Sequence, residues 1–182
     1  MPRVLTDREI ADLISEGKPL PKNWPTRLKL KPKMDTRYAQ RDLEIEGEGG
    51  HRFCVVLRRN LTNLLDFSVI LKLIDSDQTE YILLRYNGRH PSNHTNPIEK
   101  KRGLANAVFR NQFHIHRATE HYQIEYGHKS IEKYAEVTDQ YSSYDAALAQ
   151  FIHGNGFLVP SENSAGQTAI VFDTGDSIHD SQ

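Results

Sequence analysis

The segment Phe67-Ser-Val-Ile-Leu-Lys-Leu-Ile74 decides the fold of this 182-residue chain. It is strongly apolar and rich in β-branched residues, which predicts a central β-strand. The polar stretch 75–78 predicts a turn, after which Thr79 to Tyr86 returns as a second strand. Consecutive strands joined by a short turn run antiparallel, so the segment predicts an antiparallel sheet.

Two more strands precede this segment. His51 to Arg59 contains the apolar run Phe-Cys-Val-Val-Leu, and before it Leu43 and Ile45 alternate with acidic residues, as in a half-buried strand. The glycine-rich stretch 47–50 predicts the turn between them. With the later pair, these strands predict an antiparallel meander. The single cysteine, Cys54, lies in the apolar run, so we expect a core residue and neither a disulfide nor a thiolate metal site.

Helix signals flank the strands. Thr6 and Glu9 form the pattern of a capping box, and apolar residues follow at helical spacing, which predicts a short helix to about Glu16. A serine cap and a closing glycine predict a helix near residues 143–153, and a threonine cap predicts another over 119–126. The expected fold class is α+β: an antiparallel sheet of four to six strands, a short N-terminal helix and a helix near residues 143–153.

Charge is distributed unevenly along the chain, although the formal net charge of −1 predicts no partner by itself. Residues 18–33 hold six basic and no acidic side chains, and prolines punctuate them, so we expect 18–37 to be a basic, extended connector on the surface. Residues 160–182 carry acids and no lysine or arginine, which predicts a mobile tail with Thr168–Phe172 as a candidate edge strand. A single α+β domain is expected over 1–159.

The N-terminal sequence lacks the apolar run of a secretory signal. No stretch of the sequence approaches the roughly 20 apolar residues of a membrane span. We therefore expect a cytoplasmic protein without a membrane partner. The sequence carries no signal of the oligomeric state.

Polar side chains are concentrated between Arg85 and His128. Six of the nine histidines lie in the range from His90 to His128, counting both ends. If Phe113 to Arg117 is a strand, His114 and His116 point to the same face, because side chains alternate along a strand. The acidic residues that follow at 132–136 are expected to lie on a solvated face.

Two imidazoles side by side suit acid–base cleavage of RNA, because one deprotonates the 2′-hydroxyl and another protonates the leaving oxygen. His114 and His116 are the predicted catalytic pair, with His90 as an additional candidate. Neighbouring cations would hold the phosphate, and a neighbouring aromatic ring would stack a base. These candidates are Arg85, Arg89, Arg117 and Tyr86. Such a mechanism requires no metal or other cofactor.

The same histidines leave two other interpretations open. His114, His116 and Glu120 have the spacing His-x-His-x3-Glu, which supplies three ligands for zinc, iron or manganese. This spacing resembles the first half of the cupin motif, but Val108 stands where that motif has a glycine, so no metal is favoured. The remaining interpretation is a pair of hydrogen-bonded histidines without chemistry.

Three segments resemble an uncharacterised bacterial protein family and, more distantly, the TumE-type toxins of toxin–antitoxin systems. They are Leu83–His90 (LLRYNGRH), Phe113–Glu120 (FHIHRATE) and Tyr144–Ile152 (YDAALAQFI). In those toxins a β-hairpin ends in an Arg-Tyr-Asp-Asn-like motif, and a histidine-rich segment and a closing helix follow. The resemblance covers roughly Asp66 to Ile152. It implies a bacterial or phage-borne origin, a role in toxin–antitoxin or defence systems, and a cognate antitoxin or other protein as partner.

The function expected from the sequence is therefore a toxin-like, metal-independent ribonuclease with RNA as its substrate. One alternative is a non-enzymatic binding or regulatory module, acting as partner or inhibitor in a defence or nuclease system. The second alternative is a metal-dependent enzyme built on the His-x-His-x3-Glu site.

Overall fold

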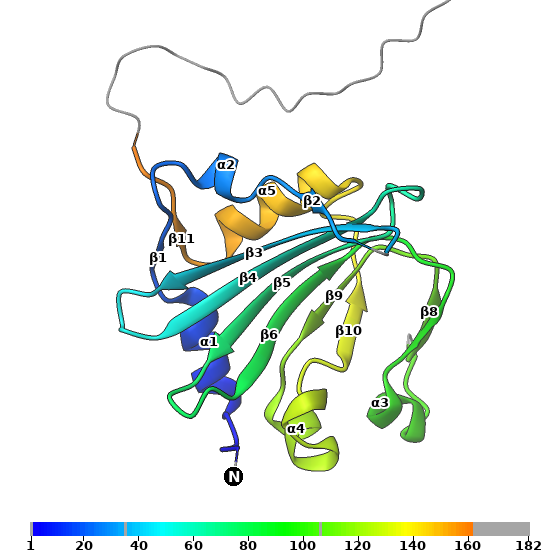
Figure 1. The fold of residues 1–182 in the computed structure, drawn as a ribbon. Coiled ribbons are helices and arrows are strands. Elements are labelled where there is room, and N and C mark those ends of the chain that lie inside the picture. Colours follow the sequence, from blue (N-terminus) through cyan, green and yellow to red (C-terminus); the bar gives the residue numbers. More distant parts are fainter. Residues whose placement is uncertain (1, 35, 106, 162–182) are drawn as a thin grey trace, which may run out of the picture.

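The computed structural model describes residues 2–34, 36–105 and 107–161. Within them, seven strands form one antiparallel sheet in the order β10-β9-β6-β5-β4-β3-β2 (Figure 1). The predicted acidic tail from residue 162 onward, with Thr168–Phe172, lies outside the described residues. The strands of the sheet are β2 (Lys31–Pro32), β3 (Tyr38–Glu46), β4 (Arg52–Asn60), β5 (Phe67–Ile74), β6 (Glu80–Asn87), β9 (His114–Arg117) and β10 (Tyr134–Val137).

The predicted α+β class and antiparallel meander are confirmed. Strands β3 to β6 follow one another in the chain and pair as neighbours. The side chains of β5 alternate between buried and half-buried along the whole strand. The described sheet also contains β2 and β10, which were not expected, because strands of two and four residues carry too little periodicity to be recognised.

Helices α1 (Asp7–Ser15) and α5 (Tyr144–Gly154) cover one face of the sheet (Figure 1). Both begin at their predicted caps: Thr6 and Glu9 form the capping box, and the Ser143 hydroxyl accepts the N–H of Ala146 at 3.2 Å. Complete burial of a large apolar side chain contributes about 1.5–3 kcal/mol. Such core residues include Phe53, Leu57, Leu71, Leu73 and Phe151. None of the described helices is both long and apolar enough to span a membrane.

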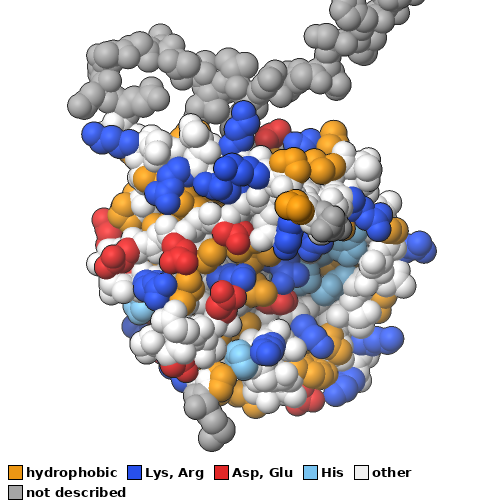
Figure 2. Space-filling view, viewed as in Figure 1, with side chains coloured by type: hydrophobic (Ala, Val, Ile, Leu, Met, Phe, Trp, Pro, Cys, Tyr) orange, Lys and Arg blue, Asp and Glu red, His pale blue; other side chains and the backbone are white. Residues whose placement is uncertain are grey.

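The opposite face of the sheet carries polar side chains. Asp42 on β3 and Arg58 on β4 are exposed, and Ser68 and Lys72 on β5 are half-buried. They alternate with the core residues because neighbours along a strand point to opposite faces. Figure 2 shows charged side chains of both signs mixed over the sheet. This face is therefore available to contact polar ligands.

The basic segment 18–37 is not a solvated, extended connector throughout. It contains β1 (Lys18–Pro19), which pairs in parallel with β11 (Phe157–Leu158), and the short helix α2 (Trp24–Arg27). Lys18 is fully buried, which corrects the expectation of a surface position. Its ammonium donates to the carbonyl groups at the C-terminal end of α1, whose last carbonyls have no partner within the helix.

The segment after β6 forms an arm of three short elements. β7 (Asn93–Thr95) and β8 (Val108–Arg110) pair antiparallel and enclose α3 (Pro97–Lys101). These short elements depend on tertiary contacts, since Ile98 is buried and its N–H donates to the Tyr122 hydroxyl on α4 (Glu120–Tyr126). The β7–α3–β8 arm therefore packs beside β10 (Figure 1).

Candidate functional site

Strands β6 and β9 bring four polar side chains to one face of the sheet. Arg85 is paired with His116, and Asn87 with His114, across these antiparallel strands. Residues directly opposite each other in such a ladder present their side chains on the same face. His114 and His116 share a face, as the alternation along β9 predicts, and they are only 2% and 6% exposed.

A third histidine completes a group that lies between β9 and the β7–α3–β8 arm. The ring centroid of His94 on β7 lies 5.6 Å from that of His114 and 4.7 Å from that of His116. The centroids of His114 and His116 are 5.0 Å apart. We call His94, His114 and His116 the histidine group, whose ligand atoms all lie within 4.8 Å of one another.

The tautomers of the two buried imidazoles follow from their partners. Nδ1 of His114 lies 2.8 Å from the carbonyl oxygen of Gln112, and Nδ1 of His116 lies 3.0 Å from that of Glu132. A carbonyl oxygen only accepts hydrogen bonds, so each Nδ1 carries the proton. Each Nε2 therefore keeps its lone pair, the arrangement that metal-binding histidines adopt when a carbonyl group orients the ring.

Asn87 contacts both of these lone pairs. Its Nδ2 lies 3.2 Å from Nε2 of His114 and 3.3 Å from Nε2 of His116. The Ser68 hydroxyl donates to Asn87 Oδ1 at 2.8 Å and so fixes which way the amide points. Each imidazole thus has a hydrogen-bond partner on both nitrogens, and both lone pairs converge on one point.

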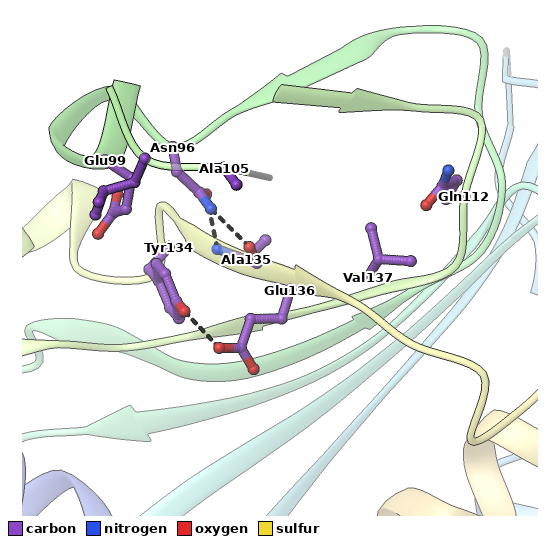
Figure 3. A pocket seen from close by; sticks show the side chains of 9 residues that line it. Asn96, Glu99, Ala105, Gln112, Tyr134, Ala135, Glu136 and Val137 are labelled. Carbon is purple, nitrogen blue, oxygen red and sulfur yellow. Dashed lines mark hydrogen bonds between the residues drawn. The ribbon is translucent and has the colours of Figure 1, made fainter. Parts of the chain in front are cut away.

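His94 is positioned by Asn96, which lies at the junction of β7 and α3. His94 Nε2 is 2.9 Å from Asn96 Oδ1. The Asn96 side chain also bonds both backbone groups of Ala135 on β10, at 2.7 and 2.9 Å, as Figure 3 shows. One asparagine therefore forms the two bonds that a further strand would make with this edge, and it holds the arm carrying His94 against the sheet.

The imidazoles of the histidine group are neutral at physiological pH. Burial, with a contribution from the Arg85 charge, lowers the pKa of His114 to about 4 and that of His116 to about 2. Burial also lowers the pKa of His94. Desolvation disfavours the charged form of a group, so the neutral ring is retained.

Arg85 and Glu132 form an ion pair beside His116. Arg85 Nη2 lies 3.1 Å from Glu132 Oε1, and Glu132 Oε2 is 3.9 Å from His116 Nδ1. The Arg85 Nε is buried and has no hydrogen-bond partner among the described residues. The Glu132 side chain is 12% exposed, which corrects the expectation that it lies on a solvated face.

Two of the remaining predicted residues lie near the histidine group. The His90 ring centroid is 5.2 Å from that of His114, and His90 is half-buried in the loop after β6. Arg89 is exposed, with its guanidinium carbon 4.7 Å above the centre of the Phe113 ring. His90 thus joins the group at its rim, whereas Arg89 packs over a ring on the core side.

The structure places three other predicted residues elsewhere. Tyr86 points into the core, where it stacks on Tyr141 at 5.4 Å, because it alternates with its strand neighbours on β6. Arg117 is exposed and alternates away from His116 in the same manner. Glu120 begins α4, and its carboxylate accepts the N–H of Asp7 at the start of α1. It is therefore not among the grouped ligands, where His94 occupies the third position.

A separate hollow lies between β10 and the β7–α3–β8 arm (Figure 3). It has a volume of about 520 Å³, and none of the described residues that line it is a histidine. Its walls share Asn96 and Gln112 with the supports of the histidine group. The lining residues are Asn96, Glu99, Leu104, Ala105, Gln112, Tyr134, Ala135, Glu136 and Val137.

The arrangement of the histidine group suits a transition metal better than proton transfer. Neutral imidazole is a good ligand for zinc, copper, iron and nickel, and three protein ligands leave a coordination position for another molecule. Comparison of the chain with protein-family models, with curated proteins and with solved structures finds no match. The interpretation of the site therefore rests on its geometry and chemistry.

Proposed function

We propose that the chain is a metal-dependent enzyme whose centre is the histidine group, His94, His114 and His116. The observation that carries this proposal is the convergence of three imidazoles whose ligand atoms lie within 4.8 Å of one another. Two of them donate Nδ1–H to backbone carbonyls and direct Nε2 inward. Zinc, iron, nickel and copper are the candidate ions.

A metal ion would require the group to close. Zinc–nitrogen bonds of about 2.0–2.1 Å place tetrahedral ligand atoms roughly 3.4 Å apart. His114 and His116 are held by carbonyls and sit on the sheet, whereas His94 sits on the short β7–α3–β8 arm. The closing movement is therefore assigned to His94. The ion would take the two lone pairs that Asn87 now occupies.

Such an ion would act as a Lewis acid or lower the pKa of a bound water. The chain's own residues supply orientation and charge. Gln112 and Glu132 carbonyls fix the rings, Asn96 positions His94, and Arg85 provides a positive charge next to His116.

The metal-independent ribonuclease expected from the sequence is the second candidate. Its support is the proximity of the half-buried His90 to His114 and the placement of Arg85 on the same face. Against it stand the lowered pKa values of His114 and His116, because a general acid must carry its proton near neutral pH. RNA cleavage that persists in EDTA and is lost in His90→Ala would favour this candidate over the metal centre.

Elemental analysis of the full chain, purified without a histidine tag, tests the proposed function. We expect stoichiometric metal in the wild type and its loss in His114→Ala, His116→Ala and His94→Ala. His121→Ala is the matched control, because His121 is exposed on α4, and it should retain the metal.

A wild-type chain that neither carries metal nor takes it up from zinc, cobalt, iron, nickel or copper salts would sink the proposal. Circular dichroism of each variant separates loss of a ligand from loss of the fold. A soluble, metal-free chain that captures a protein partner would instead support the binding-module alternative.

A further inference from the structure

Arg85 is the cation that shares a sheet face and a register position with the histidine group. It is paired with His116 across β6 and β9. Its charge is close enough to lower the pKa of both His116 and His114, after the larger effect of burial. Arg85 therefore lies on the same face as the imidazoles, next to His116 and on the side of the Glu132 carboxylate.

The bonds of Arg85 are incomplete. One N–H of Nη2 is taken by Glu132 at 3.1 Å, but the buried Nε has no partner in the part of the chain that the structure describes. Buried polar atoms without partners are uncommon in folded proteins and call for an explanation such as a bound ligand. Arg59 Nε likewise has no partner among the described residues, but that guanidinium lies over the Tyr144 ring on the α5 side of the sheet.

Charge indicates what this ligand is. Neutral imidazoles do not compensate the charge of a divalent ion, and Arg85 adds a further positive charge beside it. Glu132 compensates only part of this excess. A planar guanidinium binds phosphate oxygens through parallel N–H bonds, and a tetrahedral oxoanion has further oxygens free to reach a metal.

We propose that the metal-loaded histidine group binds a phosphate group, with one oxygen on the metal and others on Arg85. This inference rests on the proposed metal centre and assigns its substrate class as a phosphate ester or diester. Glu132 shares Arg85 with the bound anion. Removing the Glu132 charge therefore strengthens phosphate binding, whereas removing the Arg85 charge weakens it.

The test uses the full chain loaded with Co²⁺, whose visible absorption changes when an anion enters an open coordination position. Inorganic phosphate is the probe, and the spectrum gives its apparent Kd. Loss of a hydrogen bond to a charged group predicts about a tenfold or greater increase in Kd for Arg85→Gln. Arg117→Gln removes the same charge from the side of β9 facing away from the histidines and should leave Kd within about twofold. Glu132→Gln should lower Kd, and it keeps the backbone carbonyl that holds His116.

Two further probes identify the source of the phosphate group. If a short oligouridine displaces inorganic phosphate at a lower concentration than uridine does, the site is assigned to the phosphodiester of RNA. Competition by a nucleoside monophosphate alone assigns it to a small phosphate ester. Acetate that binds more tightly than phosphate would overturn the assignment in favour of a carboxylate.

Failure of this inference is distinguishable from failure of the metal centre. If Co²⁺ binds stoichiometrically but phosphate leaves the spectrum unchanged, the substrate class is wrong and the metal centre stands. If Arg85→Gln and Arg117→Gln weaken phosphate equally, Arg85 has no special role. If Co²⁺ does not bind, the metal centre itself fails. Cobalt stoichiometry and circular dichroism of Arg85→Gln show whether that variant retains the fold and the ion.

Discussion

Lys18 and the histidine group are two buried polar centres that differ in how their polar atoms are paired. The Lys18 ammonium lies 2.8–2.9 Å from the carbonyl oxygens of Leu13, Ile14 and Glu16, and over the Phe53 ring. Each of its three N–H groups therefore has an acceptor. In the histidine group, by contrast, two lone pairs share one amide, and the adjacent Arg85 Nε has no partner among the described residues.

We interpret Lys18 as a structural polar centre and the histidine group as the proposed metal centre. The Lys18 ammonium donates all its hydrogen bonds to nearby backbone carbonyls, so it needs no ligand as a further partner. Burial lowers the pKa of Lys18 to about 8, because an ammonium placed between α1 and β11 has lost its contact with water. The histidine group instead directs two Nε2 lone pairs at a single side-chain amide, which the proposed metal ion would displace. Sites built for a ligand are expected to show this pattern.

Lys18→Met should give the largest change in stability. The substitution keeps the volume of the side chain but leaves several buried carbonyls without a donor, so we expect a loss of about 4 kcal/mol in the free energy of unfolding. Chemical denaturation measures this loss. Metal uptake by the folded fraction should be unchanged, and a variant as stable as the wild type would refute the structural role of Lys18.

Acidification should destabilise the metal-free chain next most strongly. The unfolded imidazoles titrate near 6.5, whereas burial lowers the folded pKa of His114 to about 4 and of His116 to about 2. The unfolded state thus binds more protons below pH 6.5, and stability is lost as the pH falls toward the folded values. Between pH 6.5 and 5 we expect a loss of about 3 kcal/mol.

Urea denaturation of the chelator-treated chain at these two pH values measures the effect. A His114→Gln, His116→Gln variant should show a much flatter profile, because the titrating groups are gone. An equally steep profile in that variant would mean that other groups cause the acid sensitivity.

Asn87→Ala tests whether a metal ion replaces the amide at the two Nε2 atoms. Without metal, the change removes the donor shared by both Nε2 atoms, and we expect a loss of about 2 kcal/mol. With metal bound, the lone pairs are used by the ion, so most of that loss should disappear. Thermal denaturation with and without Zn²⁺ compares the two states. An equal loss in both states would show that the ion does not occupy the point where the lone pairs converge.

Asn96→Ala should weaken metal binding without removing a ligand. It removes the hydrogen bond that positions His94 and the two bonds to the Ala135 backbone, while all three imidazoles remain. Loss of a partner that orients a ligand weakens metal binding by about 10–100-fold. Competition with a chromophoric chelator gives the affinity. Asn93→Ala, on the exposed start of β7, is the control and should bind metal as the wild type does.

Long, periodic elements could be predicted from the sequence. Phe67–Ile74 alternates in burial over its whole length, and Thr6 and Ser143 form the expected caps, because these signals are local. The shared face of His114 and His116 follows from the two-residue period of a strand. Features that depend on tertiary contacts could not be predicted from the sequence. The burial of Lys18 is an example, because its acceptors include the distant Asn155 carbonyl.

The third member of the histidine group illustrates the same limit of local signals. His94 lies in a three-residue strand whose position depends on Asn96 bonding Ala135, which is 39 residues away in the chain. Glu120 has the spacing of a ligand, but its backbone begins a helix that carries it to α1. Spacing along the chain therefore predicted that His114 and His116 lie together, but it gave Glu120, not His94, as the third member of the group.

The most direct test is a crystal of the full chain soaked with Zn²⁺ and measured at the zinc absorption edge. The account predicts an anomalous peak within bonding distance of Nε2 of His114, Nε2 of His116 and one ring nitrogen of His94, with the Asn87 amide displaced from its present contacts. A soaked crystal that shows Asn87 still bonded to both imidazoles, with zinc only on exposed histidines such as His121, would contradict it.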